Sequence, residues 1–319
     1  MKVFVSGGCG QVGSHVAEML LERGDEVLAI DNFETGRRVH LPEEHERLTF
    51  VEGSIADRPL VDQLIGDFKP DVLVHTAVSY KDPEDWYNDC LINAAGGAAL
   101  IRAAMANKVG RFIYFQTALC YGIKPQQQPI TLDHPILPGD SSYSISKTPT
   151  EQYLGLSGLD WVSFRLANVI GPRNVSGPLP IFYERLKAGK KCFVTESRRD
   201  FVLSHDLAKT VLKAADGTGS GAYHFSSGTD IAIIELYDAV VKALKINEYP
   251  APDVLPLGED DVKSILLDPS RTYADFGKVA FTPLEETVRL GVEYFDKYGV
   301  HGGYTHLKHE ENDKSGDNA

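Results

Sequence analysis

Residues 5–16, VSGGCGQVGSHV, form a glycine-rich stretch that decides how the rest of the chain is interpreted. They follow an apolar strand-like segment, Lys2–Ser6, and lead into a helical pattern over Gln11–Arg23. The glycines fit two spacings, G-x-G-x-x-G counted from Gly8 and G-x-x-G-x-x-G counted from Gly7. Glycines let a backbone approach a pyrophosphate, and a helix N-terminus favours its negative charge. The turn therefore predicts a dinucleotide site, while both spacings stay open.

Strand-like and helical segments alternate through the first half of the chain. This alternation is typical of an α/β protein with a Rossmann-type doubly wound parallel sheet and helices on both faces. Because Pro and Gly break the rhythm after residue 170, we expect a dinucleotide-binding Rossmann domain over 1–170 and a smaller C-terminal α/β substrate-binding region over 171–308, with some chain returning to the Rossmann core. The polar tail over 309–319 is expected to be disordered. After the first helix, the predicted strands are Glu26–Ile30, Leu48–Val51, Val72–His75, Arg111–Gln116 and Trp161–Leu166, and helical patterns cover Leu60–Phe68 and Leu91–Asn107.

Composition limits the class of protein and the kind of partner. A chain of 319 residues, 43% hydrophobic and 24% charged, is long enough for one large domain or two closely packed ones. The net charge of −13 argues against nucleic acid or an anionic membrane as a partner. The four cysteines form no C-x-x-C pair and no zinc-ligand spacing, so no metal site is expected. No signal peptide and no apolar run of about 20 residues is present, which predicts a soluble cytoplasmic protein.

Asp31 ends the second predicted strand and points to the kind of dinucleotide. A carboxylate at that place accepts hydrogen bonds from the adenosine ribose and repels a 2′-phosphate, which favours NAD over NADP. Arg37 and Arg38 follow closely and keep NADP from being excluded. We interpret this arginine pair as part of a solvated loop.

Tyr143 and Lys147 form a Y-x-x-x-K pair that bears on the chemistry. On a helix their side chains share one face, one turn apart, and an ammonium beside a phenol lowers the pKa of the phenol towards the neutral range that a catalytic base needs. Thr117 follows the strand Arg111–Gln116, where its hydroxyl lies above the sheet at the edge that binds ligands in such folds. Glycine turn, acidic strand end, hydroxyl and Y-x-x-x-K together predict an enzyme site.

With these residues in place, the chain resembles the extended short-chain dehydrogenase/reductases, in the nucleotide-sugar epimerase/dehydratase branch typified by UDP-glucose 4-epimerase. The similarity covers nearly the whole chain and selects the frame Gly7-x-x-Gly10-x-x-Gly13. In style it is nearest to bacterial epimerases of polysaccharide pathways. Further matching segments are DNFETG at 31–36, VHTA at 74–77, TALCYG at 117–122, RLANVIGPR at 165–173, RRDFVLSHDLA at 198–208 and TPLEETVRLGVEYF at 282–295.

The resemblance implies an NAD-dependent C4 epimerase acting on a nucleotide-linked sugar, a UDP-hexose or UDP-hexuronic acid. Tyr143 as phenolate takes the proton of the sugar 4-hydroxyl, and Thr117 hydrogen-bonds the oxygen of that hydroxyl. Lys147 lowers the pKa of Tyr143 and holds the nicotinamide ribose. A transient 4-ketose then accepts hydride on its opposite face, and NAD stays bound. The family also implies a homodimer. Its cofactor positions map onto Gly7, Gly10, Gln11, Val12, Gly13, Asp31, Asn32, Ser54, Ile55, Ala77, Asn93, Tyr143 and Lys147, and its substrate positions onto Thr117, Asn168, Arg173 and Arg199.

Three positions depart from the family or stay ambiguous. Ser54-Ile55 stands where relatives have Asp-Ile near the adenine, and Leu257 stands where relatives carry an Arg that grips the nucleotide, with Lys263 as a loose substitute. Arg173 fits either a sugar carboxylate or a surface position. Cys9 and Cys120, near the expected site, are interpreted as packing residues because no base lies beside them in the sequence.

Other reactions remain as alternatives. A sugar 4,6-dehydratase needs an acid–base pair directly after the catalytic Thr, where this chain has Ala118 and Leu119. A nucleotide-sugar decarboxylase shares the hydride step and is harder to dismiss. A 4-keto reductase would need an external reductant, and a non-catalytic dinucleotide-binding protein would commonly have lost the Tyr/Lys pair.

Overall fold

The computed structural model describes residues 1–139, 141–249, 251–257 and 262–301. Its centre is a seven-stranded parallel sheet in the order β11-β6-β5-β4-β1-β2-β3. The order reverses between β1 and β4, which is the switch point where ligands bind in doubly wound sheets. The strands are β1 (Lys2–Ser6), β2 (Glu26–Asp31), β3 (Leu48–Glu52), β4 (Val72–His75), β5 (Arg111–Thr117), β6 (Trp161–Leu166) and β11 (Gly221–Phe225).

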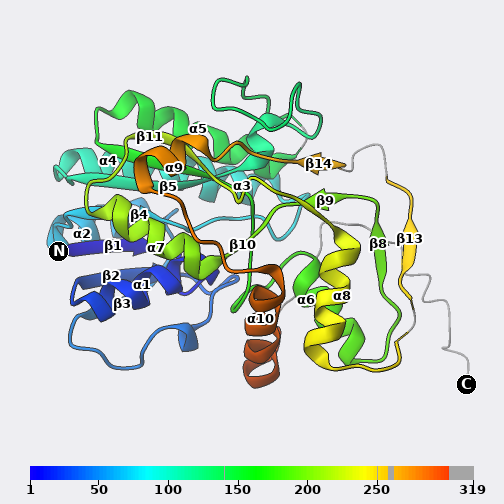
Figure 1. The fold of residues 1–319 in the computed structure, drawn as a ribbon. Coiled ribbons are helices and arrows are strands. Elements are labelled where there is room, and N and C mark those ends of the chain that lie inside the picture. The colour runs from blue at the N-terminus through cyan, green and yellow to red at the C-terminus, as the bar shows by residue number, and fades with distance from the viewer. Residues whose placement is uncertain (140, 250, 258–261, 302–319) are drawn as a thin grey trace, which may run out of the picture.

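Helices cover both faces of this sheet, as the alternating pattern predicts (Figure 1). Val3 and Val5 of β1 pack with α1 (Gln11–Arg23) and α7 (Ser204–Ala215) in one core. Phe4, between them, points to the other face and packs in a second core with the three helices that cover it. Those helices are α2 (Arg58–Phe68), α4 (Gly97–Ala106) and α5 (Ser142–Ser157).

The helix expected over 91–107 is longer and less regular than its pattern indicates. It begins as α3 (Trp86–Asp89), continues as the π-helix η2 (Cys90–Gly96), and becomes regular only in α4. A π-helix closes wider turns and re-aims side chains, and such segments concentrate at functional sites. Periodicity does not reveal this change, because the apolar spacing of the stretch remains nearly helical.

The later part of the chain builds a third core beyond the carboxyl ends of the sheet strands (Figure 1). The helices of this core are α6 (Pro178–Lys187), α8 (Ile233–Leu244) and α10 (Leu284–Tyr298). The remaining elements are η1 (Arg38–His40), η3 (Ala118–Tyr121), β7 (Asn168–Ile170), β8 (Phe193–Thr195), β9 (Arg198–Arg199), β10 (Phe201–Leu203), β12 (Ile231–Ala232), β13 (Asp253–Leu255), β14 (Ser264–Ile265) and α9 (Ser270–Phe276).

The chain beyond residue 170 also contributes to the central layers. Strand β11 pairs with β6, and α7 packs against α1 on one face of the sheet. The division into 1–170 and 171–308 stays a prediction, and the tail over 309–319 lies outside the described residues. None of the helices in the described ranges is long and apolar enough to cross a membrane.

Candidate active site

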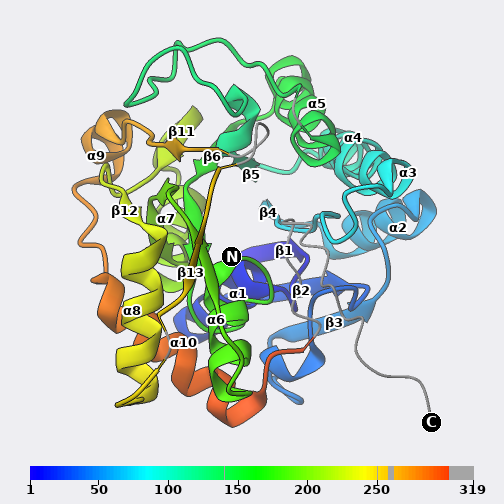
Figure 2. The same cartoon turned by 90° about the vertical axis from the view of Figure 1, so that its right-hand side faces the viewer.

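A pocket of about 480 Å³ crosses the carboxyl ends of the central strands, from the glycine turn after β1 to β9 in the later part of the chain. Figure 2 looks onto this side of the sheet. The structure therefore brings together residues that are far apart in the sequence. The expected site residues that line the pocket are Gly7, Gly10, Gln11, Val12, Asp31, Asn32, Ser54, Ile55, Ala77, Thr117, Tyr143, Lys147, Asn168 and Arg199. Gly13, Asn93 and Arg173 do not line it.

The glycine turn fits a pyrophosphate group. Gly7 has a φ of 70°, which favours glycine, and a Cβ on Gly13 would lie 2.2 Å from the Gly7 carbonyl oxygen. The absence of a side chain at Gly13 thus lets the first turn of α1 pack closely against the Gly7 backbone, behind the pocket wall. Helix α1 begins at Gln11 with no side-chain cap, and Gln11 and Val12 line the pocket. The first N–H groups of a helix without such a cap provide donors for an anion.

Asp31 is held rigidly at the end of β2. Its carboxylate accepts hydrogen bonds from the backbone N–H groups of Cys9 at 2.9 Å and Phe33 at 2.8 Å. Burial raises the pKa of Asp31, and these N–H groups oppose the shift. Arg37 and Arg38 do not line the pocket and donate instead to backbone carbonyl oxygens, Arg37 to the end of α10 and Arg38 to its own loop. Asp31, and not the arginine pair, lines the pocket.

Asn93, which the resemblance implied as a cofactor position, does not line the pocket. It is buried in η2, where its Oδ1 accepts from Ser79 N at 2.9 Å and its Nδ2 donates to Ser79 O at 2.8 Å and Ser146 Oγ at 3.0 Å. These bonds join the loop after β4 to α5. Asn93 therefore braces the pocket wall from behind, because its amide is fully engaged by protein groups.

Thr117, Tyr143 and Lys147 meet at one point of the pocket. Thr117 ends β5, and its Oγ1 accepts from Leu119 N at 3.1 Å, which fixes the hydroxyl. Helix α5 begins at Ser142 and carries Tyr143 and Lys147 one turn apart on its inner face. Tyr80, from the loop after β4, places its ring centroid 6.0 Å from that of Tyr143. Tyr80 was not among the residues expected at the site, and its only signal in the sequence is its position just after the VHTA segment.

The protein groups alone do not lower the pKa of Tyr143, contrary to the expectation from the Y-x-x-x-K pair. Burial and the nearby Tyr80 raise this pKa, and the hydrogen bond with Thr117 opposes them. Burial lowers the pKa of Lys147 to about 7, while the carboxylate of Glu151 acts in the opposite direction. A phenolate at Tyr143 would therefore need a positive charge nearby, which a protonated Lys147 one helix turn away is placed to supply.

The far end of the pocket holds Asn168 and Arg199. Arg199 lies on β9 and donates from Nη1 to the carbonyl oxygens of Val262 at 2.7 Å and Arg198 at 2.8 Å. Among the described residues that line the pocket, Lys147 and Arg199 are the cationic ones. An arginine fork at this end suits phosphate oxygens.

Arg173 lies outside the pocket lining and its charge is already paired. Its Nη2 donates to Glu18 Oε1 at 2.6 Å and its Nη1 to Ser14 Oγ at 2.9 Å, both on α1. The structure therefore gives no support for contact between Arg173 and a sugar carboxylate. Leu257 and Lys263 do not line the pocket either, and residues 258–261 between them lie outside the described ranges.

Cys9 and Cys120 behave as buried packing residues. Both side chains are fully buried, and burial raises the pKa of each thiol to about 12. A thiol of such high pKa is a poor nucleophile at neutral pH.

Comparisons with known proteins agree with this geometry. A model described as the NAD dependent epimerase/dehydratase family matches residues 3–225. UDP-glucose 4-epimerase of Mycolicibacterium smegmatis is 29% identical over 312 residues, covering 92% of this chain and 98% of that protein. The crystal structure of Bordetella bronchiseptica WbmH in complex with NAD+ is 66% identical with a TM-score of 0.92, covering 94% of this chain and 99% of the other. WbmG of the same organism, in complex with NAD and UDP, is 40% identical with a TM-score of 0.88, covering 96% and 98%.

Proposed function

The chain belongs to the NAD-dependent epimerase/dehydratase family, as its resemblance to the extended short-chain dehydrogenase/reductases predicted, and from this premise we propose that it is a nucleotide-sugar C4 epimerase. NAD is its cofactor, and the fold is of the Rossmann type. The observation that carries the proposal is the meeting of Thr117, Tyr143 and Lys147 in one pocket that also reaches the glycine turn and Arg199.

The cofactor end of the pocket suits NAD residue by residue. The turn at Gly7 and Gly10 leaves room for the pyrophosphate, the N-terminus of α1 at Gln11 and Val12 supplies donors, and Asp31 faces the adenosine ribose. Bound NAD+ supplies the hydride acceptor and donor and a positive charge near the reacting carbon.

In the proposed reaction the protein side chains control one proton. Tyr143 takes the proton of the sugar 4-hydroxyl and later returns it, which lets the C–O–H group become a ketone and revert. Thr117 hydrogen-bonds the same oxygen and keeps it in line with Tyr143. Lys147, when charged, stabilises the phenolate and holds the nicotinamide ribose. Reversal of the configuration at C4 then requires the ketose to present its other face before hydride returns to the carbon and the proton returns to the oxygen.

The substrate is proposed to be a UDP-linked hexose or hexuronic acid. A diphosphate at Arg199 and Asn168 would place the sugar towards Tyr143, because the pocket is continuous between them. The related WbmG was crystallised with NAD and UDP, which supports uridine as the base. The hexuronic acid has no support from Arg173, whose partner is Glu18.

Two other reactions fit the site less well. Ala118 and Leu119 line the pocket directly after Thr117, and neither can supply the acid or base that elimination of water across C5 and C6 requires. A decarboxylase would share Tyr143 and the hydride step, so the products must distinguish it from an epimerase.

Proton NMR of the purified protein with UDP-glucose, UDP-glucuronic acid and their N-acetylated counterparts in D2O tests the proposal. A new H4 signal with small couplings, and no deuterium in the ring, is the expected result. Deuterium at C3 or C5 would contradict the Tyr143 scheme, and loss of C6 as carbon dioxide would identify a decarboxylase instead. If none of the four sugars reacts, the UDP-hexose assignment is wrong.

The protein is also proposed to be a homodimer that uses α4 and α5. Tyr153 and Leu156 of α5 and Met105 of α4 are exposed apolar residues along a groove between these helices, and Trp86 and Tyr87 of the adjoining α3 are exposed as well. Such a cluster of exposed apolar side chains is unusual on a monomer surface. The cytoplasmic location stays a prediction.

A further inference from the structure

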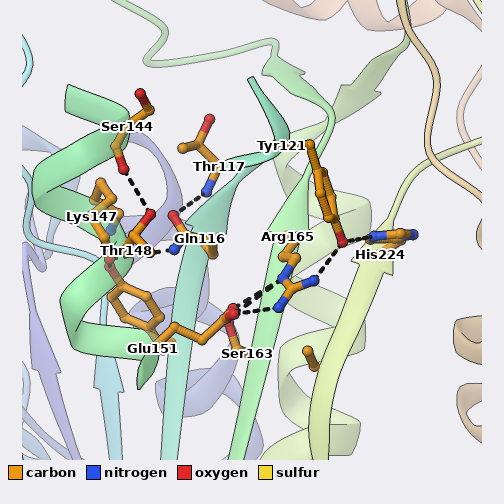
Figure 3. Close-up of polar contacts among 12 residues, drawn as sticks. Gln116, Thr117, Tyr121, Ser144, Lys147, Thr148, Glu151, Ser163, Arg165 and His224 are labelled. Atoms are coloured by element: carbon orange, nitrogen blue, oxygen red, sulfur yellow. Dashed lines mark hydrogen bonds and ion pairs between the residues drawn. The ribbon is translucent and has the colours of Figure 1, made fainter. Parts of the chain in front are cut away.

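Four residues after Lys147, helix α5 carries a second ionisable residue that faces the sheet. Glu151 lies one turn after Lys147 on the same side of the helix and is 6% exposed. Its carboxylate accepts from Arg165 Nη2 at 2.5 Å, from Arg165 Nε at 3.1 Å and from Ser163 Oγ at 2.5 Å. Figure 3 shows Arg165 reaching from β6 to this carboxylate. The negative charge of Glu151 is therefore fixed in position by two residues of the neighbouring strand.

Arg165 is itself held on its other side by a chain of hydrogen bonds (Figure 3). Its Nη1 donates to the Tyr121 hydroxyl oxygen at 2.5 Å, and that hydroxyl lies 2.6 Å from His224 Nε2. His224 Nδ1 lies 2.9 Å from the carbonyl oxygen of Asp268, so Nδ1 carries the proton and Nε2 accepts from Tyr121. Glu151, Arg165 and His224 do not line the pocket. The network is outside the machinery that touches cofactor and substrate.

Within the described ranges, Glu151 is the charged group that acts on the pKa of the buried Lys147. Its Nζ lies 4.2 Å from the ring centroid of Tyr114 on β5, and the Tyr114 hydroxyl donates to the Lys147 carbonyl oxygen at 2.8 Å. Burial holds the pKa of Tyr114 well above its ordinary value, so this phenol is neutral. His75 on β4 is fully buried, and burial followed by the charge of Lys147 holds its pKa well below the ordinary value, so this imidazole is neutral too.

The remaining groups near this point face Tyr143. They are the phenol of Tyr80, the thiol of Cys120 and the carboxylate of Asp89, whose Oδ1 accepts from Ser79 Oγ at 2.9 Å. All three disfavour the phenolate of Tyr143. Glu151 is therefore the acidic group that favours charge on Lys147. Lys147 lies one helix turn after Tyr143 and lines the same pocket, so a positive charge on Lys147 would favour the phenolate of Tyr143.

We propose that Glu151 is a positioning residue of the reaction, whose carboxylate, fixed by Arg165 and Ser163, keeps the buried Lys147 protonated and thereby sustains the base Tyr143. The inference rests on the proposed function, but its physical core concerns Lys147 alone. Burial lowers the pKa of Lys147 to about 7, so at neutral pH a modest loss of negative charge nearby converts much of this residue to the neutral amine.

The test follows the titration of Lys147 by NMR in full-length protein carrying NAD. Lysine is labelled with ¹³C at Cε, and Lys147→Met identifies the Lys147 signal. Glu151→Gln leaves Arg165 as an unpaired buried cation, which destabilises a fold strongly. The double variant Glu151→Gln/Arg165→Met removes both charges, a replacement that proteins commonly tolerate. Asp160→Asn is the matched control, because Asp160 pairs with the buried Arg111 at 2.6 Å across the other end of β5 and β6.

We expect Lys147 to lose its proton at lower pH in both Glu151 variants, by roughly one pH unit in Glu151→Gln and by less in the double variant. In Asp160→Asn the titration should stay as in the unchanged protein. An unchanged titration in the Glu151 variants would overturn the proposal. So would a titration that is lowered in Glu151→Gln but normal in the double variant, because the unpaired Arg165 would then be the cause.

The pH dependence of kcat is a second readout, because it would keep its shape if Glu151 only stabilised the fold. The bell-shaped pH profile of kcat should narrow in the double variant, with roughly tenfold lower kcat near neutral pH, and Glu151→Asp should recover part of the profile. Equal loss of kcat at every pH would contradict the role. If the protein epimerises no sugar, the Lys147 titration still decides the inference, so failure of the proposed function is distinguished from failure of this one.

Discussion

Arg173, in the loop after β7, lies 2.6 Å from Glu18 in α1 and so ties that loop to the helix that follows the glycine turn. Its backbone has a φ of 67°, which an arginine rarely adopts, and the bonds to Glu18 and Ser14 hold it there. The next residue, Asn174, lines the pocket. The pair therefore positions the pocket wall rather than a ligand.

Glu18→Gln should lower stability in a pH-dependent way. Burial acts to raise the pKa of Glu18, but the contacts with His15 and Arg173 prevail and hold it at about 2, below the usual 4.5. A lowered carboxyl pKa contributes stability that is present above pH 4.5 and is lost as the pH falls through 2. Thermal melts should show the variant below the unchanged protein at pH 7, with the difference shrinking between pH 4.5 and 2. A constant difference would show that the charge of Glu18 is not involved.

Tyr143→Phe should abolish turnover without releasing NAD. Removal of a proton-transfer group costs roughly 10²–10⁴-fold in rate, while the phenyl ring keeps the packing against Tyr80. Tyr153→Phe, on the exposed side of the same helix, is the matched control and should turn over normally. The measurements are kcat by NMR and NAD content by absorbance after denaturation. Activity within threefold of the unchanged enzyme would rule Tyr143 out as the base.

Gly13→Ala should prevent NAD binding. The new Cβ would lie 2.2 Å from the Gly7 carbonyl oxygen and 2.6 Å from Thr76 Oγ1, so the turn must open to admit it. Gly155→Ala in α5 meets nothing within 4 Å and should be neutral or stabilising by up to about 1 kcal/mol. Isothermal titration with NAD and thermal melts compare the two. Normal NAD affinity in Gly13→Ala would mean that the turn adapts without loss.

Leu156→Glu should convert the proposed dimer to a monomer. Leu156 is 82% exposed in α5, and a charge there cannot be buried against a second copy without a large penalty. Val39→Glu, a change at another exposed apolar residue in η1, should leave the assembly intact. Light scattering after size exclusion gives the mass of each. If Leu156→Glu is still a dimer, the interface lies elsewhere on the surface. If the unchanged protein is a monomer, the dimer proposal is wrong.

Local features of the sequence were enough to predict the sheet and much of the pocket. Strand β4 and helix α1 lie within the predicted bounds, while β2, β3 and β5 each extend one residue further. The glycine turn and the Tyr143–Lys147 spacing are local as well, because each depends on residues within one turn or one helix. The π-helix η2 could not be predicted, since Asn93 is re-aimed there by partners from other segments, Ser79 and Ser146.

By itself, the sequence determined the order of strands and helices in the first half of the chain, the glycine turn and the spacing that puts Tyr143 and Lys147 one helix turn apart. Only the tertiary structure decided how those residues behave. It gave Arg173 a partner on α1, turned Asn93 away from the pocket and placed Tyr80 against Tyr143. It also set the pKa of Lys147 through burial and Glu151. The physical reason is that periodicity and spacing record short-range geometry, whereas burial, charge pairing and pKa depend on residues brought together from distant parts of the chain.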